Sequence, residues 1–118
     1  MLPRDWYELI VLDGVDPDLP GLYQWDIENA GTYIGKYTHR SRPFLEYERN
    51  VMKILSGRPY RPQKPEAFRR VHRELHAAHV EGRKIRLTIL ENCLPEELAA
   101  REHMLIHERG TLNGRQKT

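Results

Sequence analysis

Residues 21–37 read GLYQWDIENAGTYIGKY, and this stretch decides the fold that the rest of the chain completes. Aromatic and β-branched residues, which favour strands, lie on both sides of a polar ENAG segment that contains a glycine. Such an interruption between two strand-forming runs is typical of a β-hairpin. The pattern therefore predicts strands over 21–27 and 31–37, and Tyr23 and Tyr33 can share one face of that hairpin.

Downstream of the hairpin, the sequence predicts two helices, a third strand and a last helix. Prolines at the start and glycines just after the end indicate helices over 43–56 and 65–81. Alternating apolar residues predict a strand over 83–91. The last helix, over 95–109, opens with a proline and two glutamates, where the helix dipole favours acids. The order strand-strand-helix-helix-strand-helix indicates an α/β (α+β) domain.

The first twenty residues are harder to interpret. The segment WYELIVL over 6–12 fits either a strand or a short helix capped by Asp5, and we favour an extended segment. Turn-forming residues follow over 13–20. We expect residues 1–20 to pack on the domain as an acidic extension.

Length and composition narrow the class of protein. A chain of 118 residues is one domain with one modest core. No apolar run is long enough to span a bilayer, and the start of the chain lacks the basic and apolar segments of a signal peptide. The single cysteine, Cys93, excludes an internal disulfide. We expect an intracellular, cytoplasmic protein.

The net charge of +2 hides an uneven distribution. Residues 1–35 hold one basic residue against seven acids, whereas residues 36–86 hold fourteen Lys and Arg against five acids. A basic block of this kind suits a phosphate-backbone partner. It also suits solvated helix faces, and charge alone does not separate the two interpretations.

Glu102 stands out within the last helix. At 100° per residue it lies on the same face as Leu98 and Ile106, so a carboxylate is predicted in the middle of the core-facing stripe. Burying an unpaired carboxylate costs several kcal/mol, so Glu102 needs a cationic partner. That partner could be an Arg or Lys in a structural ion pair, or a bound metal; the periodicity by itself favours the ion pair.

The ordered set of motifs resembles the GIY-YIG nuclease family. Its elements are Gly21-Leu22-Tyr23, Tyr33-Ile34-Gly35, a downstream arginine, Glu102 and Asn113. The resemblance covers roughly residues 20–114, and it implies a nuclease domain over 21–114 with a tail over 115–118. It also implies a small three-stranded antiparallel sheet flanked by helices.

What the resemblance implies about function is hydrolysis of DNA phosphodiester bonds with one divalent cation, Mg²⁺ or Mn²⁺, with RNA as an alternative substrate. Glu102 would be the metal ligand. Tyr23 would act on the attacking water as general base or by positioning it, and Tyr33 would hold the water or the phosphate. Arg42 would stabilise charge on the phosphate oxygens, with Arg40 as the alternative arginine.

The remaining residues would assist this site. Lys36 and His39 could help proton transfer or touch phosphate, and cations such as Arg42 or Lys36 would favour a Tyr23 phenolate. Gly21, Gly35 and Asn113 would be structural. The side chains expected to contact nucleic acid are Lys36, Arg40, Arg42, Arg49, Arg69 and Arg73.

Other interpretations stay open. The chain could be a nucleic-acid binding module on the same fold that does not cleave, or an interaction protein whose basic block binds an acidic protein. A zinc site built from the histidines is disfavoured. We expect His103 and His107 to be exposed, and His72 and His79 to pack or hydrogen-bond near the apolar stripe. The oligomeric state stays open; cutting both strands would need two copies of a one-metal site or two visits.

Overall fold

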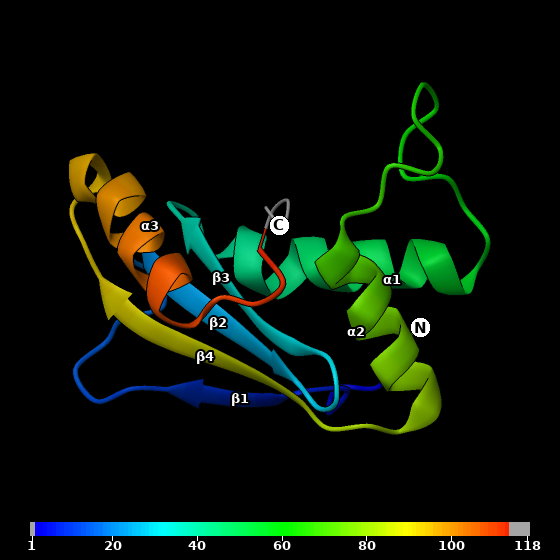
Figure 1. Cartoon of the computed structure of the whole chain (residues 1–118), viewed down its shortest axis with the longest axis horizontal. Coiled ribbons are helices and arrows are strands. Elements are labelled where there is room, and N and C mark those ends of the chain that lie inside the picture. The colour runs from blue at the N-terminus through cyan, green and yellow to red at the C-terminus, as the bar shows by residue number, and fades with distance from the viewer. Residues whose placement is uncertain (1, 114–118) are drawn as a thin grey trace.

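The structure is a computed structural model that describes residues 2–113, and it shows an α+β fold built on one mixed sheet (Figure 1). Its strands and helices are β1 (Glu8–Val11), β2 (Gly21–Ile27), β3 (Gly31–Tyr37), α1 (Tyr47–Leu55), α2 (Arg70–Glu81), β4 (Ile85–Asn92) and α3 (Leu98–Arg109). The strands lie in the order β1-β4-β2-β3. Within residues 2–113, no helix is long and apolar enough to cross a membrane.

The β2–β3 hairpin has the predicted boundaries. Its register places Tyr23 opposite Gly35 and Trp25 opposite Tyr33. Asn29 in the turn adopts a φ of 64°, in the left-handed region that asparagine tolerates better than most residues. Tyr23, Trp25 and Tyr33 consequently project to one face of the sheet and join the same buried cluster.

The prediction of a three-stranded antiparallel sheet was wrong, because the N-terminal segment adds a fourth strand. β1 pairs in parallel with β4, and β4 pairs antiparallel with β2. The extended conformation expected over residues 6–12 is found at Glu8–Val11. This strand has only four residues, and Glu8 pairs with Arg86, 78 positions along the chain. No local sequence pattern therefore predicts the pairing.

One face of the sheet is covered by α1 and α2. A π-helical turn over Arg42–Glu46 leads into α1, so the helix predicted over 43–56 is confirmed in two parts. The helix predicted from residue 65 begins only at Arg70, because the carbonyl of Pro65 accepts a hydrogen bond from the amide of Tyr60 in a loop. Gly82, with a φ of 72°, ends α2 as predicted.

The opposite face is covered by α3, which follows a single 3₁₀ turn over Pro95–Glu97 (Figure 1). Leu98 and Leu105 of α3 pack on Leu22 and Ile34 of the hairpin. The hairpin is therefore buried on both faces, and β3 lies at the edge of the sheet with α3 beside it.

Candidate active site

A pocket of about 370 Å³ opens over β3, the edge strand where side chains from both faces of the sheet meet. The residues that line it are Tyr23, Tyr33, Gly35, Lys36, Tyr37, Thr38, Arg42, Arg69, Leu98 and Glu102. The pocket therefore brings together the four side chains expected at the core of a catalytic site, which are Tyr23, Tyr33, Arg42 and Glu102. They come from β2, β3, the π-helical turn and α3.

The position of Tyr23 depends on the absence of a side chain at residue 35. A Cβ atom added to Gly35 would lie 2.2 Å from Cζ and 2.3 Å from the hydroxyl oxygen of Tyr23. The phenol ring of Tyr23 thus occupies the space of the missing side chain and reaches across β3. Its exposed fraction is 0%, so Tyr23 forms the floor of the pocket just beneath the solvent-accessible surface.

The Tyr23 hydroxyl is held by a second tyrosine. Its oxygen lies 2.5 Å from the hydroxyl oxygen of Tyr47, the first residue of α1, and both rings are buried. Burial raises the pKa of Tyr23 far above its usual value, and the Arg42 guanidinium offsets only part of that rise. Burial likewise raises the pKa of Tyr47. The Tyr23 phenolate expected from nearby cations is therefore not favoured, and the side chain is a neutral hydroxyl at neutral pH.

Arg42 and Arg40 are separated clearly by their surroundings. Arg42 lines the pocket, keeps 36% of its side chain exposed and lies 3.6 Å from the carboxylate of Glu46. Arg40 instead donates to Asp18 at 2.7 Å and stacks over the Phe44 ring, outside the residues that line the pocket. Of the two candidate arginines, the structure brings Arg42 to the tyrosines.

Tyr33 contacts another cation. The guanidinium of Arg69, just before α2, donates a hydrogen bond of 3.0 Å to the Tyr33 hydroxyl. The sequence placed Arg69 among the residues that could contact nucleic acid, and the structure places it on the pocket wall. Arg42 and Arg69 therefore lie on the same side of the pocket as the two tyrosines.

Glu102 lies across the pocket and is paired with a lysine. Its carboxylate is 3.3 Å from the ammonium of Lys36, with 20% of the Glu102 side chain and 48% of the Lys36 side chain exposed. This is the structural ion pair that the helical periodicity favoured. Because both groups reach solvent, the pair can open to admit an ion or a phosphate.

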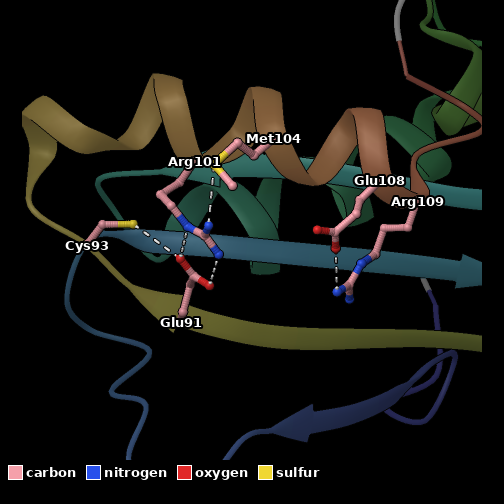
Figure 2. A network of polar contacts seen from close by, with 6 residues as sticks. All are labelled: Glu91, Cys93, Arg101, Met104, Glu108 and Arg109. Atoms are coloured by element: carbon pink, nitrogen blue, oxygen red, sulfur yellow. Dashed lines mark hydrogen bonds and ion pairs between the residues drawn. The ribbon is translucent and has the colours of Figure 1, made fainter.

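The orientation of α3, which carries Glu102, is fixed by the neighbouring residue Arg101. Figure 2 shows Arg101 reaching down from α3 to Glu91 on β4, with two hydrogen bonds of 2.7 and 2.8 Å. Bidentate pairs of this kind constrain geometry as well as distance. The Arg101 guanidinium lowers the pKa of Glu91, so the pair stays charged at neutral pH. At the other end of the helix, Arg109 donates to Gln24 of β2 at 3.1 Å.

Gly21 and Asn113, two of the residues expected to be structural, lie against backbone atoms of neighbouring strands. A Cβ at Gly21 would lie 2.2 Å from the carbonyl oxygen of Glu91, so only glycine allows β2 to approach β4 there. Asn113 accepts from the amide of Ile34 at 2.9 Å and donates to its carbonyl at 2.6 Å. Its side chain thus takes the place of a neighbouring strand along the free edge of β3.

Several predicted residues do not line the pocket. His39 and Arg49 are exposed on the surface, and Arg73 donates to the carbonyl of Glu66 at 2.7 Å. His103 and His107 are exposed as predicted, and His72 is buried as part of the core.

The hydrogen bond between Tyr47 and Tyr23 was not predicted from the sequence. The helical spacing of Tyr47 marks it as a core residue, and the only signal was a hydroxyl group within an apolar stripe. Tyr37 and Thr38, at the end of β3, were also missed as pocket residues.

The donor groups for a metal are few. Within residues 2–113, no three His, Cys, Asp or Glu side chains gather into a group that could hold an ion by themselves. Glu102 is the carboxylate on the wall of the pocket. One carboxylate leaves most of the coordination sphere to water and phosphate, an arrangement that Mg²⁺ accepts. The pocket is thus compatible with a loosely held divalent ion and with an anion bound by three cationic side chains.

Comparisons of the chain with protein-family profiles, with curated proteins and with solved structures give no match.

Proposed function

We propose that this protein is a divalent-metal-dependent DNA endonuclease of the GIY-YIG type, acting on DNA inside the cell. The observation that carries the proposal is the convergence of Tyr23, Tyr33, Arg42 and Glu102 on one pocket. These residues lie on four different elements, so their meeting depends on the whole fold. If these four residues had no common function, we would expect them to lie on separate surfaces of the molecule.

Binding of a phosphodiester follows from the charges on the pocket wall. Arg42 and Arg69 donate from the side of the tyrosines, and Lys36 can turn from Glu102 to a phosphate oxygen. Charge-assisted hydrogen bonds of this kind stabilise the extra negative charge of a pentacovalent phosphorus. In hydrolysis, a water oxygen bonds to phosphorus and releases a proton to the surrounding water, the opposite P–O ester bond breaks, and the leaving oxygen takes a proton from water.

Glu102 would hold the divalent ion in this proposal. A bound Mg²⁺ or Mn²⁺ supplies Lewis-acid stabilisation of oxygens on the phosphate. With Lys36 released, Glu102 is a partly exposed carboxylate at the pocket wall, which suits an ion that also keeps its waters.

Tyr23 is assigned a positioning role. Its raised pKa makes it a poor general base at neutral pH, since almost none of it is phenolate. As a neutral phenol bound to Tyr47 and close to Arg42, it fixes the arginine that meets the phosphate. Tyr33 does the same for Arg69 through the hydrogen bond between them.

The test is cleavage of supercoiled plasmid DNA by the purified chain with Mg²⁺ or Mn²⁺ and with EDTA. We expect nicking with either metal and none with EDTA. Glu102→Gln keeps the size of the side chain and removes its charge, so this variant should lose nicking while keeping its circular dichroism spectrum and unfolding midpoint.

Glu108→Gln is the matched control, because Glu108 is exposed on the same helix, pairs with Arg109 (Figure 2) and does not line the pocket. It should cut like the unmodified chain. Cleavage by Glu102→Gln at the same rate as by Glu108→Gln would overturn the proposal.

A second candidate is a nucleic-acid binding module that does not cleave. The Lys36–Glu102 pair favours it, because a carboxylate already neutralised by lysine has a weaker need for a metal. Binding of duplex DNA without nicking at any concentration of Mg²⁺ or Mn²⁺ would support this candidate over the nuclease.

A further inference from the structure

The connection between α1 and α2 is a second cationic feature, outside the pocket. Figure 1 shows it rising away from the sheet and ending in a narrow loop. The connection, residues 56–69, holds four cations, Arg58, Arg61, Lys64 and Arg69, against one acid, Glu66. Residues 61–67 are all exposed. The connection therefore presents its positive charge where a large partner can reach it.

The narrow loop is closed and held in shape by hydrogen bonds. The amide of Tyr60 donates to the carbonyl of Pro65, and the amide of Lys64 donates to the carbonyl of Arg61. Arg61 and Lys64 form an antiparallel bridge across the loop. Pro62 and Pro65 fix their own φ angles. Arg61 and Lys64 thus stand on either side of a constrained tip.

Aromatic rings support the tip from below. The guanidinium of Arg61 lies 5.1 Å from the centre of the Tyr60 ring, and the ammonium of Lys53 lies 5.9 Å from it. Tyr60 in turn packs edge-on against Phe68, 5.3 Å away between centres. Cations held over rings lose less freedom on binding than cations on free side chains.

The tip is also joined to the pocket by a short run of chain. Arg73 of α2 donates to the carbonyl of Glu66, which anchors the descending side of the connection. Three residues after Glu66, Arg69 reaches Tyr33 in the pocket. The tip and the pocket wall are thus joined by the short segment of residues 64–69.

We propose that the tip formed by Arg61 and Lys64 binds the phosphate backbone of duplex DNA and tethers it beside the pocket. This inference rests on the proposed function for the identity of the partner. A constrained pair of exposed cations suits two phosphates of a regular backbone, and Glu66 is the one acid of the connection. The contacts carry no base readout, so the tip sets affinity and not sequence preference.

The experiment measures binding of a fluorescein-labelled duplex by anisotropy, in EDTA, over a series of salt concentrations. The test variant is Arg61→Gln/Lys64→Gln. The matched control is Arg4→Gln/Lys84→Gln, which changes the net charge equally at exposed positions in other parts of the fold. Each neutralised phosphate contributes about 0.9 to the slope of log affinity against log salt. The tip variant should lower the size of that slope by about 1.8, and the control should leave it unchanged.

The tip variant should weaken binding equally for duplexes of different base composition. The proposal would be overturned if the control variant lowered the salt slope as much as the tip variant, or if the tip variant left that slope unchanged. Competition by poly-glutamate as strong as by unlabelled duplex, at equal charge, would also overturn it, because the tip would then bind any polyanion.

The outcome separates this inference from the proposed hydrolysis. Tip-dependent binding without cleavage in Mg²⁺ or Mn²⁺ overturns hydrolysis alone. Cleavage with a slope that the tip variant does not change overturns the tip alone.

Discussion

Gly35 and Tyr23 share one volume at the centre of the hairpin, and this determines where the pocket floor lies. The glycine of the Tyr-Ile-Gly motif is required here because a methyl group at residue 35 would overlap the Tyr23 ring. The strand pairing that sets Tyr23 opposite Gly35 is local, so the glycine and the first tyrosine form a unit across the two motifs.

Gly35→Ala should therefore destabilise the fold by about 1–3 kcal/mol, the usual cost of overpacking a well-filled interior. Urea unfolding measures the change. Tyr23→Ala removes the ring that meets the new methyl group, so the double variant should be more stable than the sum of the single losses implies. If the two losses in the free energy of unfolding simply add, the side chain at residue 35 and the Tyr23 ring do not compete for one volume.

His72 is a buried histidine whose charge state couples to stability. Burial, together with the nearby guanidinium groups of Arg69, Arg42 and Arg73, lowers its pKa to about 4. In the unfolded chain the pKa is about 6.5. Between those two values the unfolded state binds a proton that the folded state does not. Stability is thus complete above the unfolded value and falls as the pH drops from 6.5 toward 4.

The expected loss from His72 across that window is on the order of 3 kcal/mol, since one pKa unit corresponds to about 1.4 kcal/mol. Unfolding by urea at several pH values measures it. His72→Gln should flatten the dependence between pH 6.5 and 4, whatever its own cost in stability, while His107→Gln on the exposed face of α3 should not. The same slope in His72→Gln as in the unmodified chain would show that other groups cause the acid sensitivity.

At the scale of elements, the sequence predicted best where the determinants are local. The hairpin was found with its boundaries because turn residues and strand formers lie within one stretch of seventeen residues, 21–37. The end of α2 was found because Gly82 alone can adopt the left-handed conformation cheaply.

The elements that were misjudged depend on contacts with distant residues. Pro65 is a good first residue for a helix, yet its carbonyl is used by Tyr60, and α2 starts five residues later at Arg70. The choice between Arg40 and Arg42 also needed the fold. Asp18 lies 22 residues before Arg40 in the sequence. Its ion pair with Arg40 holds that arginine outside the pocket. Neither contact leaves a pattern in the neighbouring sequence.

At the scale of the molecule, the candidate site could be predicted as a set of residues but not as an environment. The motifs nominated Tyr23, Tyr33, Arg42 and Glu102, and these do line one pocket. The motifs do not determine the protonation state of Tyr23. Burial does, because it raises the pKa of Tyr23 and keeps the hydroxyl protonated in spite of Arg42. The predicted sheet lacked one strand for a similar reason, since β1 is defined by its pairing with β4 and not by its own four residues.

The N-terminal segment is part of the fold rather than a covering on it. Trp6 is 7% exposed and joins the main buried cluster, with its ring 5.7 Å from that of Trp25 on β2 and 6.5 Å from that of His79 on α2. A residue that touches both the sheet and a helix stabilises their packing. Removing it leaves a cavity at that junction.

Trp6→Ala should accordingly cost about 3–5 kcal/mol, as large aromatic truncations in a core do, and the cost should fall on the whole domain. Urea unfolding followed by Trp25 fluorescence and by far-ultraviolet circular dichroism should shift together. The control is Leu9→Ala on β1, which removes a side chain that is 46% exposed and should change stability by less than about 0.5 kcal/mol. Where Trp6→Ala leaves too little folded protein, Trp6→Phe keeps a smaller ring and should fall between the two. Equal effects of Trp6→Ala and Leu9→Ala would mean that residues 2–20 lie on the domain without supporting it.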